Sequence, residues 1–177
     1  DSISYLRIPT FSGKRTAKID SLYKASFDKI KKQPYLIIDV RNNGGGSDSN
    51  VTPLLEFIYT NKIKTDKVDL YITKDNIKIW ESWYEDAKSD TVNFDKDRVK
   101  WFEKRVERMK KAKLNSYISV SKGGRMSRRF KPNAVKKVAI IYNKNCASSC
   151  ETLLFWAKQS KKTILVGENS GGYVGYG

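Results

Sequence analysis

The chain has 177 residues, 39% of them hydrophobic and 12% aromatic, and its formal net charge is +16. This composition argues against a disordered chain, and no apolar run approaches the ~20 residues that a membrane-spanning helix needs. The sequence contains no histidine and only two cysteines, which excludes a Ser-His-Asp site built from this chain alone and a closed zinc site. We therefore expect neither a cofactor nor a metal.

Apolar periodicity and turn residues predict elements that alternate between strand and helix. The strands are expected at 4–8, 35–40, 68–73, 138–142 and 163–167, and the helices at 16–32, 52–61, 96–114 and 148–160. The run at 35–40 is apolar apart from Asp39, which is typical of a strand buried on both faces of a parallel sheet. The alternation predicts an α/β layered fold with right-handed crossovers, in one domain over residues 1–177.

The basic charge is concentrated in one segment. Between Lys96 and Lys137 there are 16 basic and three acidic residues, whereas the rest of the chain is close to neutral. Such a block can contact nucleic acid, an anionic membrane surface or an acidic protein, or it can simply be a solvated helix face. Few aromatic residues are interleaved with the charges, which argues against nucleic acid. Residues 76–130 are predicted to form a basic helical insertion within the domain.

The first segment that could form a binding or catalytic site is Leu36-Ile-Ile-Asp-Val-Arg-Asn-Asn-Gly-Gly-Gly46. Three glycines after a buried strand allow a ligand to approach the backbone N–H groups closely, as in a phosphate or oxyanion site. The segment lacks the Gly-Lys-Ser/Thr ending of a P-loop. The alternative is an ordinary flexible turn.

The second segment is Asn145-Cys-Ala-Ser-Ser-Cys-Glu151, which opens the helix after the strand at 138–142. A serine at a helix N-terminus lies in a positive potential beside free N–H groups, which favours a nucleophile. The alternative is helix capping by Ser148, with Glu151 completing a capping box.

Together the two segments resemble the C-terminal processing (tail-specific) serine peptidase family, in particular its tricorn-like branch. The matching strings occur in the family's order and leave residues 76–130 unmatched. They are Tyr5-Leu-Arg-Ile8, Leu36 to Gly46, Val138 to Tyr142, Ala147-Ser-Ser-Cys-Glu151 and Val166-Gly-Glu-Asn-Ser-Gly-Gly172. The resemblance implies a crotonase/ClpP-like fold and hydrolysis of peptide bonds through an acyl-enzyme.

The resemblance also implies roles for particular residues. Ser148 matches the nucleophile. The backbone N–H of Ser149 and that of one glycine among Gly44, Gly45 and Gly46 match the oxyanion hole. Glu151 matches an acidic position of the motif, and we interpret it as a capping residue.

The general base is where the sequence departs from the family. In the lysine-using branch a lysine follows the Gly-Glu of the last strand, but the aligned position is Tyr173 and residues 169–177 contain no lysine. The tricorn-like branch takes a histidine from a segment before the core and an acid from one after it. We therefore expect that these 177 residues are part of a longer protein, that its N- and C-terminal segments supply the base, and that this piece is inactive alone.

Cys146 and Cys150 flank Ser148 at a spacing of four. That spacing permits a disulfide by Cα separation, but the Cβ directions on a helix are constrained. We interpret the pair as two small buried hydrophobic residues beside the nucleophile.

The sequence thus predicts a serine peptidase core whose substrate is a protein or peptide. The resemblance implies a location in the cell envelope, the periplasm or outside the cell. Two alternatives remain open: a non-catalytic member that binds a peptide or other ligand in the same cleft, and a binder of an anionic surface through the basic insertion.

Overall fold

The computed structural model describes residues 2–173. The chain divides into two compact units, one formed by residues 1–64 and 125–177 and the other by residues 65–124. We call them the sheet unit and the hairpin unit. The predicted α/β class is confirmed, because the sheet unit combines parallel strands with helices.

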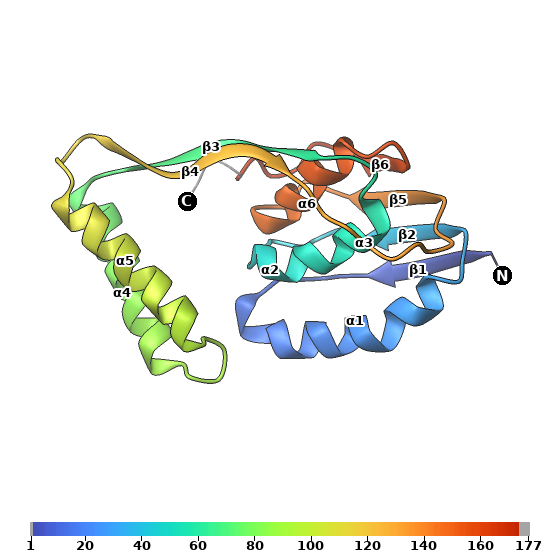
Figure 1. The fold of residues 1–177 in the computed structure, drawn as a ribbon, viewed down its shortest axis with the longest axis horizontal. Helices are drawn as coiled ribbons and strands as arrows, with labels where there is room; N and C mark the ends of the chain where they lie inside the picture. The colour runs from blue at the N-terminus through green and yellow to red at the C-terminus, as the bar shows by residue number, and fades with distance from the viewer. Residues whose placement is uncertain (1, 174–177) are drawn as a thin grey trace. The chain divides into compact units, whose positions relative to one another are not determined.

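A four-stranded parallel sheet forms the centre of the sheet unit, with the strand order β1-β2-β5-β6. Figure 1 shows the four strands side by side. Ile38 in the second strand pairs in register with Leu6 on one side and Ile140 on the other. The strands are β1 (Ile3–Arg7), β2 (Tyr35–Asp39), β5 (Lys137–Tyr142) and β6 (Thr163–Gly167).

The helices of the sheet unit bury the apolar faces that their sequences present. Helix α1 (Thr16–Ile30) buries Ile19, Tyr23, Phe27 and Ile30, which recur at steps of three and four residues. The predicted helix at 52–61 is helical as far as Ile58, but it is divided into short segments. The consecutive segments are α2 (Asp48–Val51), a 3-10 helix (Thr52–Leu54) with Pro53 near its start, and α3 (Leu55–Ile58). A 3-10 turn (Gly13–Arg15) precedes α1, and α6 (Ser149–Lys158) follows β5.

One hydrophobic core joins the sheet to these helices. Ile38 and Ile140 of the central strands are fully buried, together with Phe57 of α3 and Leu153 of α6. The ring of Phe27 packs edge-on against Phe57 with ring centroids 4.6 Å apart. Close packing of this kind transmits small displacements, so the core fixes the positions of the loops at the carboxyl ends of β2 and β5.

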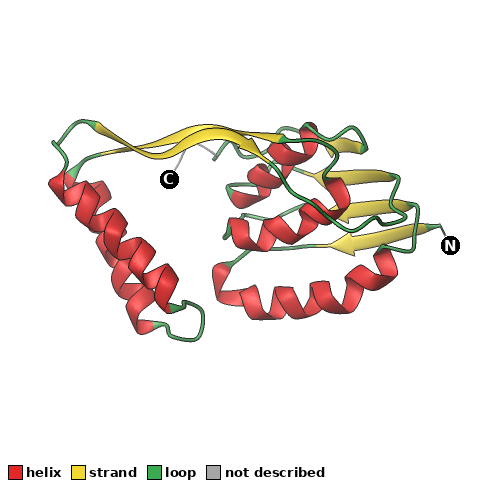
Figure 2. Cartoon of the chain, in the orientation of Figure 1, coloured by secondary structure: helices red, strands yellow, loops and turns green. Residues whose placement is uncertain are grey.

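The hairpin unit has its own core, formed by buried side chains of two long helices and the ends of two strands. Figure 2 shows α4 and α5 as paired helices joined by a short loop. Thr73 caps the first helix and Asp95 the second, each accepting a backbone N–H three residues on. The elements are β3 (Ile63–Tyr71), α4 (Lys74–Ser89), α5 (Lys96–Lys111) and β4 (Tyr117–Met126).

Two sequence expectations differ from this arrangement. Strand β4 (Tyr117–Met126), which pairs with β3, lies where the sequence predicts no strand. The compact unit also spans residues 65–124 where the sequence predicts an insertion at 76–130. In the pairing of β3 with β4, Gly123 has φ +67° and approaches Lys67 so closely that a Cβ would lie 2.7 Å from the Lys67 nitrogen. Local composition carries no information about such a contact with a distant strand. No helix within residues 2–173 is long and apolar enough to cross a membrane.

Candidate active site

The parallel sheet brings the two predicted segments together. Strands β2 and β5 are direct neighbours, so their carboxyl ends meet at the same edge, where α/β sheets usually bind ligands. The loop 42–46 follows β2 and the loop 143–148 follows β5.

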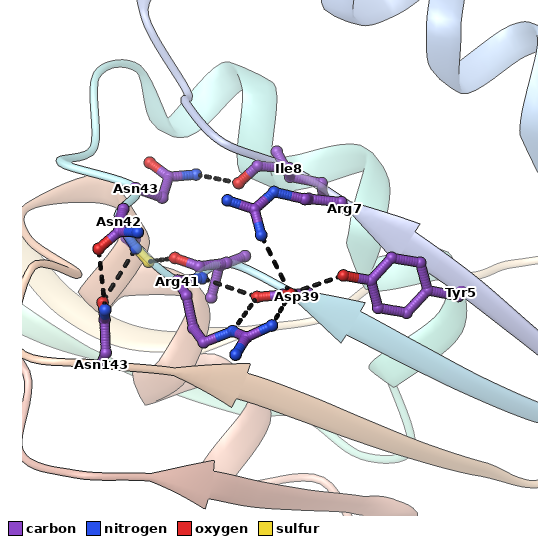
Figure 3. A network of polar contacts seen from close by, with 10 residues as sticks. Tyr5, Arg7, Ile8, Asp39, Arg41, Asn42, Asn43 and Asn143 are labelled. Carbon is purple, nitrogen blue, oxygen red and sulfur yellow. Dashed lines mark hydrogen bonds and ion pairs between the residues drawn. The ribbon is translucent and has the colours of Figure 1, made fainter.

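Asparagine side chains fasten these two loops to each other. The Asn42 N–H donates to Asn143 Oδ1 and the Asn143 amide donates back to Asn42 Oδ1, both at 2.9 Å, as Figure 3 shows. The Asn145 amide donates to the same Asn42 oxygen at 2.9 Å. Asn42 has a φ of +63°, a conformation that asparagine tolerates better than most residues.

Asn43 ties the same junction to a third segment. Its side chain is fully buried, donates to the Ile8 carbonyl at 3.0 Å and accepts the Gly45 N–H at 2.9 Å. Its backbone carbonyl accepts the Ala147 N–H at 3.1 Å. Sequence analysis did not single out Asn42, Asn43 or Asn143. The local sequence shows only a pair of asparagines between a buried strand and three glycines. Asparagine is common in any turn, so this pattern did not indicate that these side chains connect the loops.

Asp39 anchors the end of β2 by a network of polar contacts (Figure 3). Its buried carboxylate accepts the Tyr5 hydroxyl at 2.6 Å and the Arg41 guanidinium at 2.7 and 3.0 Å. Arg7 forms a longer ion pair at 3.3 Å. The hydrogen bond from Arg41 holds the pKa of Asp39 well below its usual range, although burial opposes the shift. The Asp-x-Arg part of the motif therefore joins β1 to the start of the glycine loop.

The three glycines occupy different environments. Gly45 is buried, and a Cβ on it would lie 2.5 Å from the Ala147 carbonyl oxygen, 2.8 Å from Ser148 Cβ and 2.9 Å from the Ser149 nitrogen. Its φ of +92° also favours glycine. Gly44 and Gly46 are exposed. Only a residue without a side chain permits this contact between the two loops.

Existing hydrogen bonds determine which backbone N–H groups of these loops could bind an oxyanion. The Gly45 N–H is taken by Asn43 Oδ1, so it is not available to a ligand. Within residues 2–173, the N–H groups of Ser149, Gly44 and Gly46 donate no hydrogen bond. These are the N–H groups that an oxyanion at this edge of the sheet could use.

Ser148 lies on the surface at the junction between β5 and α6. Its backbone has φ +53° and ψ −122°, which an L-residue adopts only when its surroundings impose it, at a cost of about 1–3 kcal/mol. The turn leaves Ser148 exposed while Ser149 directly after it is buried. The helix therefore begins with an accessible hydroxyl beside an unbonded N–H group.

Glu151 stabilises this turn from within. Its carboxylate accepts the N–H groups of Ser148, Gly172 and Tyr173 at 2.7–2.9 Å and the Ser170 hydroxyl at 2.7 Å. Burial alone would raise the pKa of Glu151, but the hydrogen bonds from Ser170 and the three N–H groups lower it overall. The predicted capping role is confirmed, and Glu151 also connects α6 to the segment after β6.

The interpretation of the cysteines was only half right. Cys146 and Cys150 are fully buried as expected, but they form a disulfide with a Cα–Cα distance of 5.6 Å. The sequence-based interpretation assumed that both cysteines lie on one helix, where their Cβ directions constrain disulfide formation. Cys146 precedes α6, which starts at Ser149, and the positive φ of Ser148 separates the two cysteines from a common helical turn. A cysteine nucleophile is excluded, because neither sulfur is a thiol.

The position that matches the family lysine is occupied by Tyr173, an exposed residue whose N–H donates to the Glu151 carboxylate. Residues 174–177, which complete the stretch without lysine, lie outside the described residues. With no histidine in the chain, no Ser-His pair can form within these residues.

Comparison with solved structures identifies the fold. The chain resembles a candidate peptidase from Parabacteroides merdae (18% identity, TM-score 0.56), covering 99% of this chain and 42% of that one. It also resembles mature CPAF (16% identity, TM-score 0.52), with 96% and 38% covered. A lipoprotein from Streptococcus agalactiae gives 18% identity and a TM-score of 0.54, with 97% and 48% covered.

The chain therefore spans less than half the length of these structures. No curated protein sequence matches it. The profile of peptidase family S41, however, matches residues 2–176, almost the whole sequence. The glycine loop, the exposed serine at the start of α6 and this match lead to the same conclusion: the chain belongs to peptidase family S41.

Proposed function

We propose that this chain carries the nucleophile and the oxyanion hole of a serine peptidase. The observation that supports the proposal most directly is the contact of Gly45 with Ser148 and Ser149. This contact puts an exposed hydroxyl beside N–H groups that donate no hydrogen bond within the described residues. A nucleophile and preorganised donors in this arrangement suit acyl transfer.

In the proposed reaction, Ser148 Oγ attacks the carbonyl carbon of the scissile peptide bond as its proton passes to a general base. The carbonyl oxygen becomes an oxyanion and accepts the Ser149 N–H together with the N–H of Gly44 or Gly46. The C–N bond then breaks, the amine leaves with the proton, and an ester remains on Ser148. Water hydrolyses that ester and regenerates the hydroxyl.

The general base is proposed to come from outside these 177 residues. The chain has no histidine, and the position that matches the family lysine is Tyr173. A segment of a longer protein would supply the base, and the chain alone would react slowly.

A fluorophosphonate probe tests this proposal. The longest protein that contains this chain should be labelled at Ser148, as located by mass spectrometry of the labelled peptide. Ser148→Ala should abolish the labelling, whereas Ser82→Ala, which alters an exposed serine of α4, should leave it unchanged. Equal labelling of Ser148→Ala would refute the assignment. Absence of labelling together with tight peptide binding would favour the non-catalytic alternative.

A comparison of the 177-residue chain with the longer protein tests the origin of the general base. The 177-residue chain should be labelled at least about 10²-fold more slowly than the longer protein, because a general base contributes about 10²–10⁴-fold. Equal rates at neutral pH would show that a group within these residues acts as the base.

We also propose that α5 contacts an anionic membrane surface. The guanidinium groups of Arg98 and Arg105 lie 4.3 and 4.8 Å from the Trp101 ring centroid. Within the described residues, neither forms an ion pair with a carboxylate. Cations beside an exposed tryptophan suit a lipid headgroup region.

Co-sedimentation with phosphatidylserine vesicles should therefore exceed that with neutral phosphatidylcholine vesicles and weaken as salt rises. Arg98→Gln should reduce it, in contrast to Lys88→Gln on α4. Equal binding to both kinds of vesicle would refute the proposal, as would a preference for single-stranded DNA over lipid.

A further inference from the structure

The chain's only two cysteines bracket the candidate nucleophile. The Cys146–Cys150 disulfide closes a ring of five residues with Ser148 at its centre. Both sulfur-bearing side chains are fully buried, and Cys150 Sγ lies 3.9 Å from the Val40 carbonyl oxygen at the end of β2. The ring is thus in contact with the strand that leads into the glycine loop.

Backbone hydrogen bonds attach this ring to two other segments of the chain. The Ala147 N–H donates to the Asn43 carbonyl at 3.1 Å, and the Gly171 N–H donates to the Cys146 carbonyl at 2.8 Å. Within the ring, the Cys150 N–H donates to the Ala147 carbonyl at 3.0 Å. The hydroxyl and the N–H group that carry the proposed chemistry both belong to this ring.

The ring also contains the strained residue. Ser148 has a φ of +53°, and strain of this kind persists only where the surrounding structure leaves the backbone no alternative. The disulfide links Cys146 and Cys150, which lie two residues before and two residues after Ser148. This link limits how far the ends of the turn can separate, and so it restricts the other backbone conformations that Ser148 could adopt.

We propose that the disulfide is a positioning device for the active site. It holds Ser148 in its strained conformation and keeps the Ser149 N–H against Gly45. This inference rests on the proposed function. Cys146 and Cys150 are positioning residues and do not touch the substrate. The disulfide should accelerate acylation of Ser148 and contribute little to substrate binding.

Reduction of the disulfide provides one way to test this role. A dithiol reductant transfers two electrons and two protons, so the S–S bond breaks, two thiols form, and the reductant becomes a cyclic disulfide. The two thiols are no longer covalently joined, so the ends of the ring are free to separate. The ring should then relax towards an ordinary helix start.

The main experiment measures labelling of Ser148 by a fluorophosphonate over a range of probe concentrations. The Cys146→Ala/Cys150→Ala variant should show a rate of inactivation at saturating probe that is about 10- to 100-fold lower, the effect of a small misplacement of reacting groups. The concentration for half-maximal rate should change less than threefold. Wild-type protein kept in dithiothreitol should behave like the variant.

A control variant separates positioning from stability. Ile30→Ala removes buried side-chain atoms from α1, away from the ring, and should lower the melting temperature without lowering the labelling rate at 20 °C. If the cysteine variant and Ile30→Ala are labelled at the wild-type rate, the disulfide has only a structural role and the proposal is overturned.

Hydrogen exchange gives a result that does not depend on catalysis. Loss of the disulfide should speed exchange of the Ala147 amide, which bonds to Asn43, at least tenfold, while amides of α1 stay unchanged. Unchanged exchange at Ala147 in reduced wild-type protein would overturn the proposal, even if the cysteine variant failed to fold. If no form is labelled but Ala147 exchange still responds, the proposed peptidase function fails and the positioning of the ring stands.

Discussion

Gly45 lies so close to Ser148 that a Cβ on residue 45 would stand 2.8 Å from the serine Cβ. The two residues belong to loops that follow neighbouring parallel strands. The requirement for glycine at position 45 thus arises from the approach of another chain segment and from a φ of +92°. It does not arise from the Gly45 N–H group, which is bonded to Asn43.

Replacing Gly45 by alanine should therefore disturb the candidate site. The added methyl group would meet the Ala147 carbonyl, Ser148 Cβ and the Ser149 nitrogen at 2.5–2.9 Å. The labelling rate of Ser148 should fall by about 10²-fold or more, as it does when an oxyanion donor is lost. Gly13→Ala is the matched control, because a Cβ there meets nothing within 4 Å. Equal labelling of the two variants would contradict the prediction.

Asn43 should contribute strongly to stability. Its buried side chain satisfies the Ile8 carbonyl and the Gly45 N–H, and both lose their partner in Asn43→Ala. An unsatisfied buried group costs about 1–3 kcal/mol, so the free energy of unfolding should fall by about 2 kcal/mol in urea denaturation. Asn61→Ala alters a half-buried loop residue whose side chain hydrogen-bonds to its sequence neighbours Thr60 and Lys62, and it should change the free energy of unfolding by less than about 0.5 kcal/mol.

The hydrogen bonds to Glu151 should make stability depend on pH. Its pKa is lower in the folded state than the ordinary value of 4.5, so its ionised form stabilises the fold above that value. This stabilisation is lost as the pH falls through the lower, folded-state pKa. Glu151→Gln should be about 2 kcal/mol less stable than wild type at pH 7, because bonds to a charged acceptor are the stronger ones.

The difference between wild type and Glu151→Gln should shrink when urea denaturation is repeated below the ordinary pKa of 4.5, because the unfolded chain then binds a proton that folded Glu151 does not yet bind. It should be lost once the pH falls through the lower, folded-state pKa of Glu151. General acid destabilisation of a basic chain affects both proteins alike and cancels in the comparison. A difference that stays constant from pH 7 to pH 3 would rule out a stabilising role for the charge.

Arg105 should act as a packing residue as well as a charge. Its guanidinium lies 4.8 Å from the Trp101 ring centroid and 5.5 Å from that of Trp80, and burial together with Arg108 and Arg98 lowers its pKa. Arg105→Gln should destabilise the hairpin unit by about 1 kcal/mol and shift the tryptophan emission. Lys104→Gln removes the same charge from an exposed neighbour and should have little effect on either.

The sequence alone predicted the central strands and the start of the last helix. The apolar runs at 35–40 and 138–142 are typical of buried parallel strands, and the structure has β2 and β5 at these positions. The Ser-x-x-Glu pattern places an N-cap residue and its partner at fixed spacing, so the capping role of Glu151 could be predicted locally. The same motifs were sufficient to indicate the peptidase family.

Only the tertiary structure decided how these parts form a site. That β2 and β5 are neighbours, that Asn43 occupies the Gly45 N–H, and that Cys146 and Cys150 are bonded all depend on contacts between distant segments. The extent of β4 depends on its pairing with β3 in the same way. Local propensity describes each residue with its sequence neighbours, whereas pairing of strands and occupancy of a hydrogen-bonding group depend on which other segment lies opposite. For this reason the sequence indicated Ser148, Ser149 and the glycines as candidates, and the fold determined which of their N–H groups remain available.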